Sequence, residues 1–174
     1  MKRFLIVALV VVPVFSFSQA YSILTQKQQS QVIDEVLEHR LRNLLPGLMR
    51  REQIDCWLVI SREYNEDPII ETLLPSTWMA ARRTTMLVMF DRGSDQELEF
   101  LAISRYDVGK LFRRSWDPEA EPDQWKQLAK VLQERNPKKI AVNTSDHEGI
   151  ADGISATELQ MLKKSLPENL KSKI

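Results

Sequence analysis

The sequence predicts an α/β fold in which a mixed β-sheet is flanked by helices. Three segments carry apolar residues at the three- and four-residue spacing of amphipathic helices, and four short apolar runs lie between them. Their order along the chain is helix, strand, hairpin, helix, strand, helix, which places helices against a sheet. We expect one domain, because the roughly 150 residues after the N-terminal segment are enough to bury one core.

The first 20 residues have the pattern of a secretory signal. Two basic residues precede a mostly apolar run over 4–17, and the small residues Ser18 and Ala20 suit cleavage after Ala20. The run is shorter than the roughly 20 apolar residues of a membrane-spanning helix and contains a proline, so it favours a cleaved signal over a stable membrane anchor. The sequence therefore predicts export, with the mature chain periplasmic or secreted.

The first half of the mature chain predicts a long helix, a strand and a loop. Apolar residues recur with helical period over 27–49, and Pro46-Gly47 is expected to end or kink that helix. The continuous apolar run over 56–60 predicts a central strand buried on both faces. Turn-forming residues break the pattern over 61–83, which predicts a long loop.

The second half predicts a hairpin, two more helices and a further strand. The hairpin consists of strands over 84–90 and 98–103, with Gly93 in the turn. The other elements are a helix over 122–135 with Asp123 at its start, a strand over 139–143, and a helix over 155–165. Ser155 and Glu158 match a capping box at the start of that last helix.

Composition excludes several function classes. The chain has 24 Lys and Arg side chains against 24 Asp and Glu. Loss of the signal removes Lys2 and Arg3, so 22 basic side chains face 24 acidic ones and the net charge becomes about −2. Acidic residues are interspersed among the basic pairs, and we expect no nucleic-acid binding. Cys56 is the only cysteine, so no internal disulfide can form, and its apolar surroundings predict a buried thiol rather than a nucleophile.

Few residues carry recognisable catalytic or metal-binding patterns. Glu35 and His39 stand four apart on the first helix, which is the spacing of a metal pair but also of an exposed helical stripe. A second group with ligand-type atoms lies in one loop and consists of Asp146, His147, Glu148 and Asp152. Its spacing matches no calcium or zinc signature, and its role stays open. We predict no catalytic residue and no metal ligand in this chain.

Two further patterns each allow a functional and a non-functional interpretation. Asn143-Thr144-Ser145 fits a glycosylation acceptor, a pattern that also arises by chance. At the end of the predicted loop, Trp78 precedes Arg82 and Arg83, so an aromatic ring and a guanidinium fork stand four residues apart. Arginine can bind a carboxylate through two parallel hydrogen bonds, and this group is our candidate contact for a peptide terminus. The alternative is a packed tryptophan beside a surface arginine.

Three segments resemble a known enzyme family. They are DCWLVISREYNEDP at 55–68, ISRYD at 103–107, and the stretch over 140–153 that begins IAVNTS and ends ADG. These segments resemble exported bacterial members of the creatinase, prolidase and Xaa-Pro aminopeptidase family. The resemblance runs from about Val32 to the C-terminus.

The resemblance implies a specific fold and role. Family members have an N-terminal α/β domain with a ribonuclease-H-like sheet, followed by a pita-bread catalytic domain that binds two divalent metals such as Mn, Co or Zn. After the signal peptide at 1–20, it implies the N-terminal domain at 21–166 and, at 167–174, the start of a severed linker to a missing catalytic domain. The chain itself is then expected to be inactive and to hold no cofactor.

The resemblance also implies partners. The N-terminal domain of relatives helps to form a homo-oligomer and shapes the entrance through which short peptides reach the catalytic half. Trp78, Arg82 and Arg83 lie in the loop expected to face that half, and the partner would be the catalytic domain itself or its homologue. Two alternatives remain: a free-standing exported binding or oligomerisation module, and a small hydrolase that uses the loop at 146–152.

Overall fold

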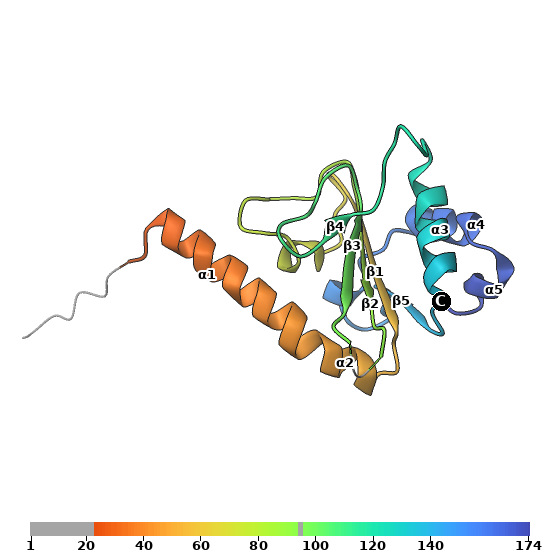
Figure 1. Cartoon of the computed structure of the whole chain (residues 1–174), viewed down its shortest axis with the longest axis horizontal. Helices are drawn as coiled ribbons and strands as arrows, with labels where there is room; N and C mark the ends of the chain where they lie inside the picture. Colours follow the sequence, from red (N-terminus) through yellow and green to blue (C-terminus); the bar gives the residue numbers. More distant parts are fainter. Residues whose placement is uncertain (1–22, 94–95) are drawn as a thin grey trace, which may run out of the picture.

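The computed structural model describes residues 23–93 and 96–174, and the expected signal peptide at 1–20 lies outside them. A five-stranded sheet forms the middle layer, with helices on both faces (Figure 1). The predicted α/β class with a mixed sheet is confirmed. None of the helices in the described ranges has the length and apolar character needed to cross a bilayer.

The sheet has the strand order β4-β3-β2-β1-β5. Its strands are β1 (Cys56–Arg62), β2 (Thr84–Phe90), β3 (Glu99–Ile103), β4 (Arg113–Arg114) and β5 (Ile140–Val142). β1, β2 and β3 pair antiparallel, whereas β5 pairs parallel with β1 and β4 pairs parallel with β3. Sequence patterning did not predict β4, because two exposed arginines have no apolar alternation.

Alternate residues of the central strands pack into two separate hydrophobic cores, one on each face of the sheet. On one face Leu58 and Ile60 pack with α3 (Gln124–Arg135), α4 (Ala156–Ser165) and α5 (Glu168–Lys171). On the other face Val59 and Leu87 pack with α1 (Gln26–His39), α2 (Leu45–Arg51) and the loop residues that follow β1. Because β1 is covered on both sides, its residues form the continuous apolar run seen in the sequence.

The first predicted helix is continuous and contains a widened turn. Thr25 and Gln28 form a capping box at its start, and a π-helical turn spans Arg40–Leu44. The Leu45 N–H donates to the Arg40 carbonyl just before Pro46, which has no N–H to donate. The proline therefore accompanies a change of turn and does not end the helix.

The helices α3 and α4 start where the sequence predicts, whereas α5 lies in the segment that was expected to be a linker. The Asp123 carboxylate accepts from the first amides of α3, and the Ser155 and Glu158 capping box opens α4. After α4 the chain continues into α5, where Leu170 is fully buried. The Lys173 carbonyl then accepts from the Ile140 N–H at 2.7 Å, so residues 167–174, the expected linker segment, pack against this domain.

Cys56 lies in the core as predicted, with no exposed surface. Burial, and secondly the adjacent Asp55 carboxylate, raise the pKa of its thiol far above the ordinary value. A thiol that stays protonated is a poor nucleophile. Cys56 therefore acts as a small apolar side chain in this fold.

Candidate functional site: an arginine and tryptophan pocket

The three residues singled out in the loop line one cavity. Trp78, Arg82 and Arg83 border a cavity of about 420 Å³ together with Arg105 and Trp116, which come from the segment after β3. The rest of the lining consists of Glu63, Thr84, Thr85, Ser104, Tyr106 and Gln124. We call this cavity the arginine–tryptophan pocket. It combines residues that lie far apart in the sequence.

The pocket lies at the end of the sheet where β1 and β3 finish and β2 begins. Arg62 at the end of β1 pairs with Thr84 at the start of β2, and Met86 pairs with Ile103 at the end of β3. The side chain of Gln124, the first residue of α3, donates to the Thr84 carbonyl at 2.9 Å and to the Ile103 carbonyl at 2.6 Å. This glutamine ties α3 to two strands at the pocket floor.

The backbone at Arg83 is held in an uncommon conformation. Its φ is 51°, in the left-handed region that few side chains other than glycine adopt freely. The Glu63 N–H donates to the Arg83 carbonyl at 2.6 Å, and the Arg83 N–H donates to the Glu63 carboxylate at 3.2 Å. The Thr85 hydroxyl also bonds to the backbone of Arg82. Residues in such conformations cluster at binding sites, where neighbouring contacts hold them.

Two arginines stack on the two tryptophans. The Arg82 guanidinium carbon lies 4.8 Å from the centre of the Trp78 ring, and that of Arg105 lies 5.9 Å from the centre of the Trp116 ring. Trp116 is fixed because its indole N–H donates to the Glu121 carbonyl at 2.7 Å. A guanidinium attracted to an aromatic face keeps its N–H edge free for an acceptor.

Among residues 23–93 and 96–174, the guanidinium groups of the pocket have no carboxylate partner. In the described residues no hydrogen bond or ion pair involves the guanidinium of Arg82, Arg83 or Arg105. Six other arginines in the same part of the chain do form ion pairs: Arg42, Arg50, Arg51, Arg92, Arg113 and Arg135. The pocket therefore concentrates positive charge that its own lining does not neutralise.

A buried polar network lies at the same end of the sheet and was missed by sequence reasoning. Asp67 is 1% exposed, and its carboxylate accepts from the Ile69 N–H at 2.9 Å and from the Asn143 amide at 2.7 Å. Trp57 in turn donates to the Asn143 side-chain oxygen at 2.8 Å. A Cβ on Gly153 would overlap all three terminal atoms of the Asp67 carboxyl group.

This network has electrostatic and chemical consequences. The pKa of Asp67 is raised: burial is the largest cause, its hydrogen bonds with Ile69 and Asn143 oppose the rise, and the Glu158 carboxylate adds to it. The Asn143 amide that a glycan would occupy already donates to Asp67, so modification there would require the network to open. The Asp-Pro and Asn-Thr-Ser motifs could have signalled these positions, but nothing in their spacing shows that the two segments meet.

The other candidate residues do not form a site. Asp146, His147 and Glu148 are exposed, and Ser145 caps the turn by accepting from the backbone amides of His147 and Glu148. Glu35 and His39 are exposed on α1. Within 23–93 and 96–174 no three His, Cys, Asp or Glu side chains gather as a metal site would require. The basic pair Arg113-Arg114 forms the exposed edge strand β4.

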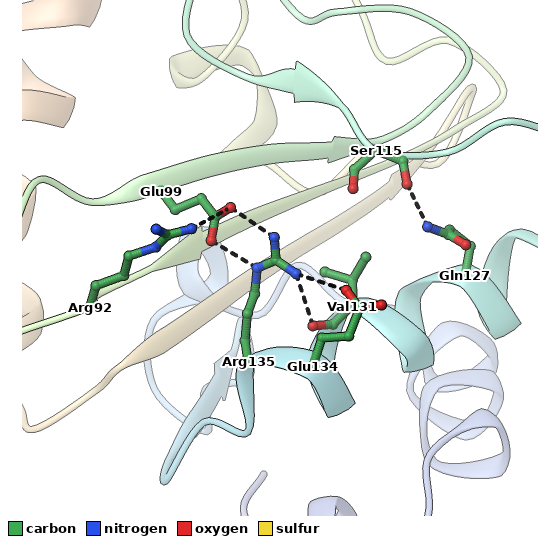
Figure 2. Close-up of polar contacts among 7 residues, drawn as sticks. All are labelled: Arg92, Glu99, Ser115, Gln127, Val131, Glu134 and Arg135. Carbon is green, nitrogen blue, oxygen red and sulfur yellow. Dashed lines mark hydrogen bonds and ion pairs between the residues drawn. The ribbon is translucent and has the colours of Figure 1, made fainter.

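The opposite end of the sheet carries paired charges. Glu99, at the start of β3, accepts from the two arms of Arg135 at 2.7 and 2.8 Å and from Arg92 at 3.0 Å (Figure 2). Arg135 is the last residue of α3, so this cluster ties the helix end to the sheet. The Arg135 hydrogen bonds, opposed in part by burial, lower the pKa of Glu99. Asp91 is bound in the same two-armed way by Arg50.

No protein-family model and no curated protein sequence matches this chain at a significant level.

Proposed function

We propose that this chain is the non-catalytic N-terminal domain of an exported Xaa-Pro aminopeptidase-like protein, and that it shapes peptide access to a separate catalytic domain. The observation that carries the proposal is the arginine–tryptophan pocket, in which three arginines without carboxylate partners meet two tryptophans. Arginine and tryptophan are the residues most enriched where proteins bind partners tightly.

The surroundings of the pocket support a binding role. Tyr106 in its lining is 57% exposed, and Met79, next to Trp78, is 93% exposed. Tyr64, in the turn after β1, is 94% exposed. Large apolar side chains at a basic rim have the composition of an interface rather than of a free surface. We expect this rim to face the catalytic domain or its homologue.

The segments that carry the family resemblance also meet in space. Asp67 from the first segment contacts Asn143 and Gly153 from the last one. Their chemistry is structural here, because the contact joins the ends of β1 and β5. This network supports the rigidity of the sheet end on which the pocket is built.

The side chains of this chain do not fit the two-metal centre of the family. Such a centre needs several converging carboxylate and imidazole ligands, and the described residues provide no group of three. We therefore assign the two divalent ions of the proposed enzyme to the catalytic domain.

Two measurements test the proposal. The purified chain is incubated with Xaa-Pro peptides and Mn²⁺ or Co²⁺, and we expect no cleavage, whereas turnover by the chain alone would overturn the assignment. Genomic DNA downstream of the codon for Ile174 is then read. A pita-bread coding region, in frame or frameshifted, is the expected result, and an unrelated neighbour would favour a free-standing module.

One observation favours that second candidate, an exported oligomerisation module. The outer face of α1 leaves Val32, Ile33 and Val36 between 45% and 50% exposed, and the helix runs away from the sheet towards the N-terminus (Figure 1). An apolar helical stripe of this kind pairs readily with another helix. Light scattering tests it: the chain should be an oligomer, and Val32→Ser with Val36→Ser should shift it to monomer. A monomeric unsubstituted chain would count against this candidate.

A further inference from the structure

We propose that the arginine–tryptophan pocket binds the free C-terminal carboxylate of a peptide, which pairs with the guanidinium edges of Arg82 and Arg105 while the adjoining side chain packs in the cavity against the tryptophans. This inference rests on the proposed function and deepens it, because it names the chemical group that the pocket takes.

The charge of the pocket selects an anion. Its lining holds the guanidinium groups of Arg82, Arg83 and Arg105, which have no ion-pair partner among the described residues, against one carboxylate, that of Glu63. Glu63 is engaged with the Arg83 backbone N–H at 3.2 Å and not with a guanidinium. The site therefore keeps an excess of positive charge directed at a cavity, where a bound anion gains charge-assisted hydrogen bonds.

The geometry favours a planar carboxylate over a phosphate. Arg82 and Arg105 lie over the rings of Trp78 and Trp116, and each guanidinium group offers parallel N–H groups that match the two oxygens of a carboxylate. Phosphate sites usually add free backbone amides at a helix start. Here the first amides of α3 already donate to the Asp123 side chain, so they are not free to bind a phosphate.

The cavity also has room for the residue that bears the carboxylate. Its volume of about 420 Å³ lies within the range of small-ligand pockets, about 300 to 1,000 Å³. Trp116 is 9% exposed, and Trp78 is half-buried, so the aromatic rings form walls rather than projecting into solvent. An apolar side chain next to the carboxylate would bury surface against them.

The test is an NMR titration of the purified chain with the peptide acetyl-Ala-Pro-Leu, following tryptophan indole and arginine Nε–H signals. Acetylation leaves the C-terminal carboxylate as the only charge of the probe. We expect this acid to bind at least about 10-fold more tightly than its C-terminal amide, since a hydrogen bond to a charged group contributes that much. Added salt should weaken binding of the acid.

Substitutions locate the carboxylate. Arg82→Gln and Arg105→Gln should each lower the affinity about 10-fold, and Arg82→Lys should recover little, because an ammonium lacks the planar fork. Arg51→Gln is the matched control, since Arg51 is an exposed arginine paired with Glu52 outside the pocket. The indole signal of Trp57, which donates to Asn143 and does not line the pocket, should be unchanged in the variants without peptide, and this shows that they remain folded.

Three outcomes would overturn the inference: equal binding of acid and amide, a loss of affinity in Arg51→Gln as large as that in Arg82→Gln, and tighter binding of inorganic phosphate than of the acid. These results are separate from those that test the proposed function. Cleavage of Xaa-Pro peptides by the chain would overturn the proposed function and leave carboxylate binding intact. Equal binding of acid and amide would overturn carboxylate binding and leave the proposed function intact.

Discussion

At the end of the sheet where β3 begins, Glu99 lies between Arg135 and Arg92, while at the end where β3 finishes, Arg82 and Arg105 line a cavity without a carboxylate partner among the described residues. The first arrangement joins a helix end, a strand and a turn, so its charges stabilise the fold. The second leaves positive charge uncompensated in a cavity. We take the difference to separate a structural end of the sheet from a binding end.

Two carboxylates, the partly buried Glu99 and the buried Asp67, repeat this contrast. Glu99 accepts from arginines, which lower its pKa, whereas Asp67 at the binding end accepts only from uncharged donors, and burial raises its pKa. An ion pair offsets desolvation for Glu99 and nothing comparable does so for Asp67. The binding end therefore depends on close packing and uncharged hydrogen bonds for its rigidity.

Gly153→Ala should have the largest effect. The added methyl group would overlap the Asp67 carboxyl group and disrupt the buried network, so we expect unfolding free energy to fall by about 3 kcal/mol. Urea unfolding measures it. Gly47→Ala is the control: nothing lies within 4 Å of its added Cβ, and in a helix alanine should stabilise by about 0.5 to 1 kcal/mol. Equal results for the two variants would refute the packing argument.

Glu99→Gln should destabilise the protein by about 2 kcal/mol, because it leaves the guanidinium of Arg135, 18% exposed, without its charged partner. Thermal or urea unfolding at pH 7 checks this. Glu97→Gln breaks an ion pair with Arg42 in which the glutamate is 82% exposed, and it should cost less than about 0.5 kcal/mol. A cost for Glu99→Gln no larger than that of Glu97→Gln would remove the distinction between the two ends.

The pH dependence of stability should run in opposite directions for the two carboxylates, with a smaller effect than either substitution. Glu99 has a lowered pKa, so its contribution is present above the unfolded pKa of about 4.3 and is lost as pH falls through the folded pKa. Asp67 has a raised pKa, so its contribution is present below the unfolded pKa of about 3.9 and is lost as pH rises through the folded pKa.

Unfolding curves between pH 3 and 8 measure these slopes. The stability difference between the unsubstituted chain and Glu99→Gln should shrink in acid, and the difference between that chain and Asp67→Asn should shrink as pH rises. If the two stability differences changed with pH in the same direction, Glu99 and Asp67 would not differ in environment as we propose.

Local rules predicted most of the fold. Strands β1, β2, β3 and β5, the caps at Asp123 and Ser155, and the buried Cys56 follow from periodicity, capping chemistry and apolar context, all of which act over a few residues. β4 was missed because its two arginines join the sheet only through pairing with β3. The π-helical turn was missed because proline chemistry alone does not say whether a helix ends or widens.

The candidate site could be predicted only in part. Trp78, Arg82 and Arg83 are neighbours in the sequence, so their common location was accessible, whereas Arg105 and Trp116 reach the pocket only because β3 lies beside β2. The contact between Asp67 and Gly153 likewise depends on the parallel pairing of β1 with β5. Residues that are far apart in the sequence and meet only through strand pairing leave no recognisable spacing pattern in the sequence.

Arg82→Gln should have the smallest effect on stability. The Arg82 guanidinium has no ion pair among the described residues, and stacking of an exposed arginine on Trp78 contributes about 0.5 kcal/mol, so the unfolding free energy should fall by no more than about that amount. Arg135→Gln, which leaves the partly buried carboxylate of Glu99 without its two-armed partner, should cost about 2 kcal/mol in the same urea experiment. A cost for Arg82→Gln as large as that for Arg135→Gln would show that the pocket arginines stabilise the fold. A residue that serves binding need not stabilise the fold. A smaller stability cost for Arg82→Gln than for Arg135→Gln is therefore what we expect if this end of the sheet is a binding site.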